Sequence, residues 1–464
     1  MPLQFPHIFS NMKFQTVIFR CCTLTILLSS AINPGTARDA VKPLKLPAVP
    51  ESSQPPYYST VYEPPTRPKP GQLQIGVTYT LWIPEGLKTV RGIIVHQHGC
   101  GSGSCTGSVT AAHDLQWQEL AKRNNCALLG PSFHQAKEQN CRLWCDPRNG
   151  SAHVFVDSLK KLAKVSGHPE VATAPWCLWG HSGGGFWSSL MQMAYPERIA
   201  AIWFQSGTAF GYWKAGETPA PKITPAAMKI PMMANPGVKE REGKPPTGAW
   251  GGCLAMFQDY RAKGAPIGFA PDPASGHETR DSRYLAIPFF DACLKLRLPD
   301  RAGDPLKEVD TSKGWLVESL SNKAPVSAKE YQGDARKAVW LPSETVAKDW
   351  QEFVTSGDVN DTSPPPAPTH IRVDPKSGMI TWKADVDFES GLQSFVIERD
   401  GKVIARVPEK PHNRFGRPLF QGMSYGDTPE LPLMKFQFVD STAKKGEDHQ
   451  YRVIAVNTVG LKSP

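Results

Sequence analysis

The chain lacks long apolar runs, and this limits what it can be. Of its 464 residues, 40% are hydrophobic and 20% are charged, and the mean hydropathy is −0.35. The apolar run over 21–31 is too short for a membrane-spanning helix, which needs about 20 such residues. A protein with several membrane spans is therefore excluded, and a soluble globular protein is expected.

The chain also lacks a concentrated patch of charge and the spacing of a metal site. The 52 Lys and Arg exceed the 43 Asp and Glu by a formal net charge of +9, but no patch dominates, so no nucleic-acid partner is expected. No Cys-x-x-Cys pair and no Cys/His spacing suggests zinc. We therefore expect no metal and no cofactor.

Residues 1–37 resemble a secretory signal. Lys13 and Arg20 precede the apolar run, and small, helix-breaking residues follow it. This order is typical of a leader that is removed on export, and a retained membrane anchor is the alternative. We expect a secreted protein, periplasmic or extracellular, with no integral membrane segment after signal removal.

Export would permit disulfides among the cysteines that remain. Removing Cys21 and Cys22 from the ten cysteines leaves eight, which allow 105 pairings, so no connectivity is ranked. Cysteines close in sequence are candidate loop staples, whereas buried free thiols are expected in apolar runs. The candidate pairs are Cys100 with Cys105 and Cys141 with Cys145, and the candidate free thiols are Cys126 and Cys177.

Proline marks the domain boundaries. Residues 38–70 are crowded with proline, and this composition predicts a spacer that packs no core. A second break lies at 359–368, where polar turn-formers meet four prolines. The chain thus divides into a first domain over 71–358 and a second over 364–464.

The first domain alternates short apolar runs with helical spacing. Helical periodicity covers 153–164, 186–195 and 282–298, between runs rich in β-branched and apolar residues. This alternation predicts an α/β fold, a mostly parallel sheet with helices on both faces. The expected strands are 75–84, 92–98, 126–133, 174–179, 199–205, 230–235 and 266–270.

The end of the chain differs in pattern. Short alternating runs separated by turn signals fill 364–464, which predicts a small all-β sandwich. Between the two, residues 301–357 carry Trp315, Trp340 and Trp350. We expect this segment to be a C-terminal extension that packs back on the first domain.

Ser182 is the candidate nucleophile. It stands in Gly180-His181-Ser182-Gly183-Gly184, between a predicted strand and a predicted helix. A serine on so sharp a turn projects its hydroxyl outward, and the flanking glycines avoid clashes. A tight glycine turn with an idle serine is the alternative.

A serine needs a base to take its proton, and in a strand-turn-helix setting the base comes later in the chain. Four histidines follow Ser182, and three of them lie beyond the proline boundary. This leaves His277, in a loop between the last predicted strand and the helix expected over 282–298. A surface loop histidine is the alternative.

The third member would be a carboxylate that orients the imidazole. Glu240 directly follows the predicted strand 230–235, where chain order and strand exit favour it. Glu242 and Asp272 remain open as rivals.

The developing oxyanion needs preset backbone donors. The glycine-rich turn after the strand 92–98 offers the amide of Cys100, and Gly183 offers a second amide at a helix N-terminus. The turn lacks the Lys-Ser/Thr ending of a phosphate-binding loop. Trp213 and Trp250 follow strands where a substrate wall would form, although core packing is equally compatible.

Together, the glycine-rich turn, the serine turn and the late histidine resemble the α/β-hydrolase family over roughly residues 72–300. Within that fold, the chain resembles secreted esterases of the polyhydroxyalkanoate-depolymerase and feruloyl or acetylxylan esterase type. The resemblance implies Ser182 as nucleophile, His277 as base and the Cys100 and Gly183 amides as oxyanion hole. It departs at the acid, where relatives usually carry Asp and this chain offers Glu240.

The tail resembles a fibronectin type III module. Pro365-Pro-Ala-Pro at its entry, Trp382 in its second strand and Tyr451 at the start of its last strand carry this likeness. Such modules commonly act as spacers or docking units.

The resemblance implies a secreted serine hydrolase that cleaves carboxylic esters through an acyl-enzyme, on polysaccharide-linked or polyester substrates. A serine peptidase of the same fold and a non-catalytic exported binding protein are the alternatives.

Overall fold

A computed structural model describes residues 42, 44–47, 53–242, 247–432, 435–444 and 447–464. The secretory signal expected over 1–37 lies outside these residues. Among the residues described, no helix combines the length and the apolar character that crossing a bilayer requires.

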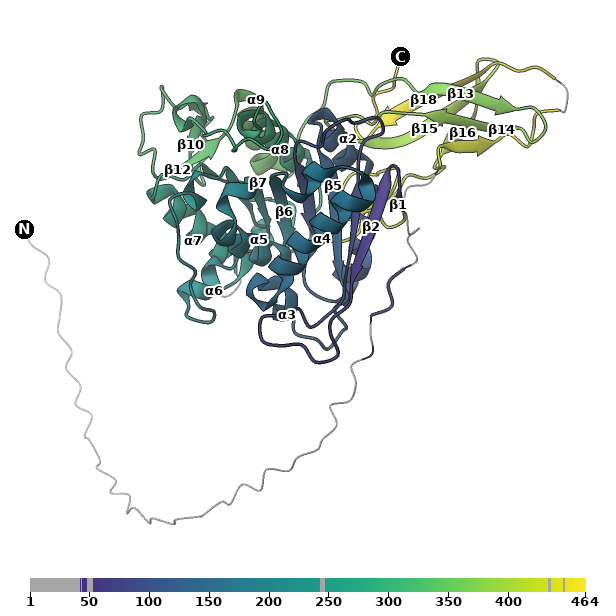
Figure 1. Cartoon of the computed structure of the whole chain (residues 1–464). Coiled ribbons are helices and arrows are strands. Elements are labelled where there is room, and N and C mark those ends of the chain that lie inside the picture. The colour runs from purple at the N-terminus through teal and green to yellow at the C-terminus, as the bar shows by residue number, and fades with distance from the viewer. Residues whose placement is uncertain (1–41, 43, 48–52, 243–246, 433–434, 445–446) are drawn as a thin grey trace, which may run out of the picture. The chain divides into compact units, whose positions relative to one another are not determined.

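A nine-stranded sheet forms the centre of this part of the chain, in the order β1-β2-β3-β5-β4-β6-β7-β8-β9 (Figure 1). The pairs from β1 to β5 are antiparallel, and those from β5 through β4 to β9 are parallel. The strands are β1 Ser53–Gln54, β2 Tyr57–Tyr62, β3 Val77–Trp82, β4 Ile93–Gln97, β5 Ala127–Phe133, β6 Trp176–His181, β7 Ile199–Gln205, β8 Met232–Asn235 and β9 Ile267–Phe269.

The central strands have no exposed residue: β6 and β7 are buried along their whole length. Layers therefore cover both faces of the sheet, which is why these strands are near-continuous apolar runs. Each strand predicted between 75 and 270 overlaps one of β3 to β9. The expected large, mostly parallel sheet with helices is confirmed.

Helices connect the strands and pack on the sheet, α4 against β2, α5 against β6 and β7, and α8 against β7. Helix α4 ends at Gly167, whose left-handed backbone (φ 73°) glycine adopts without strain. The helices are α1 Ser102–Ser108, α2 Leu115–Arg123, α3 Arg142–Cys145, α4 Ser151–Ser166, α5 Gly183–Ala194, α6 Phe210–Lys214, α7 Ala249–Ala262, α8 Arg283–Arg297 and α9 Glu344–Ser356.

Part of the proline-rich stretch belongs to the sheet, so the spacer predicted over 38–70 is wrong for residues 53–54 and 57–62. Strand β2 pairs along its length with β3, and Tyr58 is buried in the main core. The prolines flank this strand rather than interrupt it. Between them, aromatic and β-branched residues fit a pleated, half-buried surface.

The segment 301–357 contains a small antiparallel sheet, β11-β10-β12, followed by α9. Its strands are β10 Trp315–Glu318, β11 Val326–Ser327 and β12 Ala338–Leu341. Trp350 of α9 is buried in the main core and donates from Nε1 to the carbonyl of Phe269 at 2.9 Å. This contact ties the segment to β9, the last strand of the large sheet.

The tail forms two three-stranded antiparallel sheets, β13-β14-β17 and β16-β15-β18. Ile380 and Trp382 of the first sheet share an apolar cluster with Phe395, Ile397 and Val453 of the second. The strands are β13 Thr369–Asp374, β14 Met379–Lys383, β15 Leu392–Arg399, β16 Lys402–Val407, β17 Gln437–Val439 and β18 Tyr451–Asn457.

Candidate active site

Ser182 occupies the sharp turn between β6 and α5. Its backbone is strained, with φ 53° and ψ −112°, a conformation that non-glycine residues adopt mainly at functional turns. A Cβ on Gly180 would lie 2.5 Å from the carbonyl carbon of Gly184, and one on Gly184 would lie 2.5 Å from the carbonyl oxygen of Gln97. Glycine at both positions therefore lets the turn close against β4.

His277 lies within hydrogen-bonding distance of Ser182. Its Nε2 is 2.8 Å from the Ser182 Oγ, and its Nδ1 is 2.6 Å from Oε1 of Glu240. Because the carboxylate only accepts, Nδ1 carries the proton and Nε2 is free to accept from the serine hydroxyl. The three side chains thus form one chain of hydrogen bonds.

The loops after β8 and β9 bring the acid and the base together. Gly237 and Asp272 form a parallel bridge that extends this strand pair, and the Val238 amide donates to the Asp272 carbonyl at 2.8 Å. Glu240 ends the short 3₁₀ turn that follows.

The structure separates Glu240 from its two rivals. Glu242 is exposed. Asp272 is buried and accepts from the Ala274 amide at 2.8 Å, so its carboxylate holds the loop that leads to His277. Of the three acids, Glu240 alone is hydrogen-bonded to the imidazole in the described chain.

The two expected oxyanion donors lie side by side. If Gly183 carried a Cβ, that atom would lie 3.3 Å from the Cys100 amide nitrogen, so the backbone of Gly183 is next to this amide. In the same way, a Cβ on Gly99 would lie 3.2 Å from the Ser182 Cβ, so the turn that carries Cys100 is next to Ser182. Gly183 is the first residue of α5, where amides have no partner inside the helix. Within the described residues, neither amide donates to another group.

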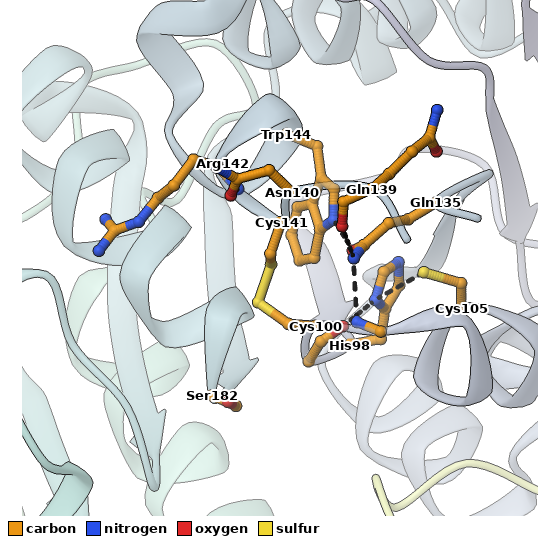
Figure 2. Close-up of a disulfide and its surroundings, with 12 residues drawn as sticks. His98, Cys100, Cys105, Gln135, Gln139, Asn140, Cys141, Arg142, Trp144 and Ser182 are labelled. Atoms are coloured by element: carbon orange, nitrogen blue, oxygen red, sulfur yellow. Dashed lines mark hydrogen bonds between the residues drawn. A yellow bond between two sulfur atoms is a disulfide. The ribbon is translucent and has the colours of Figure 1, made fainter. Parts of the chain in front are cut away.

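A disulfide joins Cys100 to Cys141, with the Cα atoms 5.6 Å apart (Figure 2). The pairs expected from sequence proximity, Cys100 with Cys105 and Cys141 with Cys145, are therefore wrong. Cys105 and Cys145 are free and buried. Both lie on short helices, whose backbone direction rather than sequence distance decides where a thiol points. Cys126 and Cys177 are free buried thiols, which confirms that alternative.

A cavity of about 260 Å³ opens beside Ser182 and His277. Trp213 and Trp250, predicted to form a substrate wall, do not line it. Both are buried, Trp213 against Phe210 and Trp250 against Phe269, with ring centroids 5.4 and 5.6 Å apart. The structure thus shows core packing, the alternative given for both tryptophans. The sequence pattern did not determine which face of its helix each tryptophan occupies. The aromatic walls are Phe186 and Tyr212.

His181, inside the serine motif, contributes to the loop of the base. Burial, followed by the charge of the neighbouring His277, lowers the pKa of His181 to about 3, so the ring is neutral. Its Nε2 lies 2.7 Å from the His277 carbonyl, to which it donates. The motif thus fixes the backbone of His277 in addition to presenting the serine.

A segment of the tail lies beside His277, which sequence reasoning missed. The carbonyl of Tyr425, between β16 and β17, accepts from the amide and the hydroxyl of Thr279. Its ring centroid is 6.3 Å from that of His277 and 5.7 Å from that of His181. Burial, with the charge of Glu278, raises the pKa of Tyr425 to about 12, so its hydroxyl stays protonated.

Asp427 anchors this segment to helices that pack beside the large sheet. Arg283 donates to it from Nε at 2.7 Å and Trp117 from Nε1 at 2.9 Å, and all three side chains are buried. Burial alone would raise the pKa of Asp427, but the Arg283 guanidinium and the hydrogen bond from His96 hold it below its usual value. No local sequence pattern announces such a long-range contact.

Two groups of side chains approach the spacing of a metal site. Cys100, Cys141 and Cys145 are close together, but the first two are oxidised to a disulfide and offer no thiolate. Asp361, Asp387 and Glu389 form the other group in the tail. There, the Asn457 amide donates to both Asp361 and Asp387, so protein donors already occupy carboxylate oxygens.

Comparison with known proteins gives distant structural likenesses. No family model matches the chain, and no curated protein matches it in sequence. Poly(aspartic acid) hydrolase-1 from Sphingomonas sp. KT-1 is 16% identical, covering 48% of this chain and 94% of its own, with a TM-score of 0.35. An S-formylglutathione hydrolase from Agrobacterium tumefaciens is 13% identical, covering 52% and 93%, with a TM-score of 0.34.

A carboxyl esterase from Bacillus coagulans is 10% identical, covering 51% of this chain and 99% of its own, with a TM-score of 0.31. Likeness at this level is too distant to assign an activity. The chemistry of the site has to be inferred from its own geometry.

Proposed function

We propose that the protein is a serine hydrolase that cleaves carboxylic ester bonds. The hydrogen-bonded chain from Ser182 through His277 to Glu240 carries this proposal, because it joins a strained, outward-facing hydroxyl to an oriented base. Two unpaired amides next to the hydroxyl add the donors that an acyl-transfer reaction requires.

In the proposed reaction, Ser182 Oγ attacks the ester carbonyl while His277 Nε2 takes its proton. The Cys100 and Gly183 amides stabilise the oxyanion, and Glu240 stabilises the imidazolium. His277 then gives the proton to the leaving alcohol, which departs and leaves an acyl-enzyme. A water molecule, activated by the same imidazole, releases the acid and restores Ser182.

Hydrolysis of p-nitrophenyl acetate tests this reaction. We expect turnover by the wild type and a loss of at least about 10⁴-fold in Ser182→Ala. Wild-type rates in the variant would sink the proposal. Cleavage of peptide anilides by the wild type, with no ester turnover, would favour the peptidase alternative.

The proposal extends to an exported enzyme acting on esters of polysaccharides or on polyesters. It rests here on the leader-like start of the sequence and on the family resemblance. A panel of acetyl, feruloyl, glucuronoyl and hydroxyalkanoate esters, assayed on the wild type, distinguishes these classes.

A further inference from the structure

Among the described residues that line the cavity beside Ser182, one side chain is permanently charged. Arg142, at the start of α3, lines it together with Ser182 and His277. No carboxylate is among its described lining residues. A ligand that enters this cavity therefore meets a positive charge that no acid at the wall neutralises.

Two aromatic rings hold the Arg142 guanidinium in place. Its central carbon lies 3.7 Å from the ring centroid of Phe186 and 4.4 Å from that of Tyr212. Stacking of this kind fixes the plane of the guanidinium without using its N–H donors. The charge is therefore positioned while its hydrogen-bonding capacity stays free.

The backbone of Arg142 is fixed as well. Its amide donates to Asn140 Oδ1 at 2.9 Å, and its carbonyl accepts from Asn149 Nδ2 at 2.7 Å. The preceding residue, Cys141, forms the disulfide with Cys100, so α3 is tied to the turn that carries an oxyanion donor. Figure 2 shows that Arg142 directly follows Cys141 and that its side chain extends away from the disulfide.

The guanidinium has no acceptor in the described chain. Its Nη1 is buried without a hydrogen-bond partner, and Arg142 forms no ion pair there. By contrast, Arg148, six residues further on, donates to both carboxylate oxygens of Asp146, at 2.8 and 2.6 Å. Arg142 as a whole is half-buried, but its Nη1 is shielded from water, and a buried donor without a partner is costly, which indicates that a ligand supplies the acceptor.

We infer that Arg142 binds a carboxylate carried by the substrate, so that the preferred ester is anionic. The planar guanidinium matches a carboxylate with two parallel hydrogen bonds. Because Arg142 and Ser182 line the same cavity of about 260 Å³, the anion and the scissile ester are expected to belong to one small ligand. This inference rests on the proposed esterase function and names its substrate class.

Matched pairs of esters test it. On the alcohol side, 4-acetoxybenzoate is compared with the neutral isostere 4-acetoxybenzamide, and on the acyl side, monomethyl terephthalate with methyl 4-carbamoylbenzoate. After correction for uncatalysed rates, we expect kcat/KM to favour the carboxylate about 10- to 100-fold in one pair, mainly through KM. Equal rates within both pairs would overturn the inference.

Variants locate the preference. In Arg142→Met the ratio of kcat/KM for the carboxylate ester to that for the neutral ester of the favoured pair should fall to about one. Arg142→Lys should keep only part of this preference, because an ammonium cannot donate two parallel hydrogen bonds to a carboxylate as a guanidinium does. Lys137→Gln, which removes an exposed positive charge nearby, should leave the ratio unchanged. A ratio that persists in Arg142→Met would overturn the assignment. Equal preference for 4-sulfophenyl acetate would overturn the restriction to carboxylates.

A binding measurement separates this inference from the proposed function. Calorimetry of Ser182→Ala with benzoate and with benzamide needs no turnover. Binding of benzoate that is lost on adding Arg142→Met would support the anion site even if no ester were cleaved. Ester hydrolysis without benzoate binding, and without a charge preference, would sustain the function and overturn the inference. Fluorophosphonate labelling of Arg142→Met reports whether that variant keeps a folded serine site.

Discussion

At the scale of single residues, two glutamates separated by one position have different surroundings. Glu240 is hydrogen-bonded to His277 Nδ1 at 2.6 Å, whereas Glu242 is exposed. The carboxylate next to an imidazole sets its tautomer and stabilises the imidazolium that forms on proton transfer. The proposed role therefore belongs to the first glutamate and not to the second.

Substituting the two glutamates tests this difference. Glu240→Gln should lower kcat by about 10³- to 10⁴-fold, because the amide favours the wrong tautomer of His277. Glu242→Gln is the matched control and should retain wild-type turnover of p-nitrophenyl acetate. The assignment would be wrong if both variants lost activity equally or if neither did.

The positions of the candidate site residues were predictable where they follow from chain order. Ser182 is marked by glycines that the turn needs at close range, and His277 is the one histidine between it and the proline boundary. The side-chain directions of Trp213 and of the cysteines were not predictable. They depend on which face of a short helix each residue occupies, and a helix of about one turn shows no periodicity from which that face could be predicted. As a result, Tyr212 lines the cavity and its neighbour Trp213 does not.

At the scale of elements, the disulfide connects the turn after β4 with α3. The loop that it closes has a sequence separation of 41 residues. Cross-linking a loop of this length restricts the unfolded chain by about 4 kcal/mol in the loop-entropy description. The bond therefore stabilises the wall that carries both the Cys100 amide and Arg142.

The variant Cys100→Ser/Cys141→Ser should lose about 2–4 kcal/mol of unfolding free energy, measured by urea denaturation. A reductant should destabilise the wild type by a similar amount and leave this variant unchanged, since the other described cysteines are free thiols. Equal stability of the wild type with and without reductant would contradict the bond.

Helix α9 carries a carboxyl group that makes stability depend on pH. Burial, followed by the nearby carboxylates of Glu352 and Glu389, raises the pKa of Asp349 from 3.8 to about 7. The folded state thus binds this proton more tightly than the unfolded state does. The unfolding free energy should fall as pH rises from about 4 to about 7.

The variant Asp349→Asn should remove part of this dependence, because its amide does not titrate. Urea denaturation at pH 5 and pH 8 measures how the unfolding free energy changes with pH. Asp304→Asn, which replaces an exposed acid, should keep the pH dependence of the wild type. If the unfolding free energy of Asp349→Asn changed with pH as much as that of the wild type, the Asp349 carboxyl would not contribute to the pH dependence.

Most strands of the large sheet were predictable from the sequence, because strands buried on both faces are runs of apolar residues. Strands β4 to β9 are short apolar runs because both faces of the parallel part of the sheet are covered. Strand β2 was missed because prolines surround it. The small sheet β11-β10-β12 was missed because its strands are too short to show alternation.

At the scale of the whole molecule, the segment between β16 and β17 joins the tail to the domain of the nine-stranded sheet. Besides the contacts of Asp427, the Arg417 amide donates to Asp281 at 2.9 Å and Gln421 Nε2 donates to the His113 carbonyl at 2.7 Å. Because these groups come from distant parts of the sequence, no local pattern predicted the contact. A role as spacer or docking unit, typical of fibronectin-like modules, does not account for it.

Asp427→Ala should therefore destabilise the whole described unit. The substitution leaves the buried Arg283 with one fewer carboxylate partner. Removing one partner of a buried ion pair lowers the unfolding free energy by about 3–5 kcal/mol. Thermal unfolding should shift to lower temperature, and ester turnover should be lost at the same midpoint. Asp448→Ala, at an exposed position, is the control. Unchanged unfolding of Asp427→Ala would show that the tail contributes nothing to the core.

Covalent labelling with a fluorophosphonate tests whether His277 activates Ser182. A fluorophosphonate reacts with a serine only when a neighbouring base activates it, and mass spectrometry of the digested protein locates the adduct. The account predicts one adduct, on the peptide that contains Ser182, present in Glu242→Gln, absent in Ser182→Ala and greatly slowed in His277→Ala. An unlabelled wild type, or an adduct that forms equally fast without His277, would contradict it.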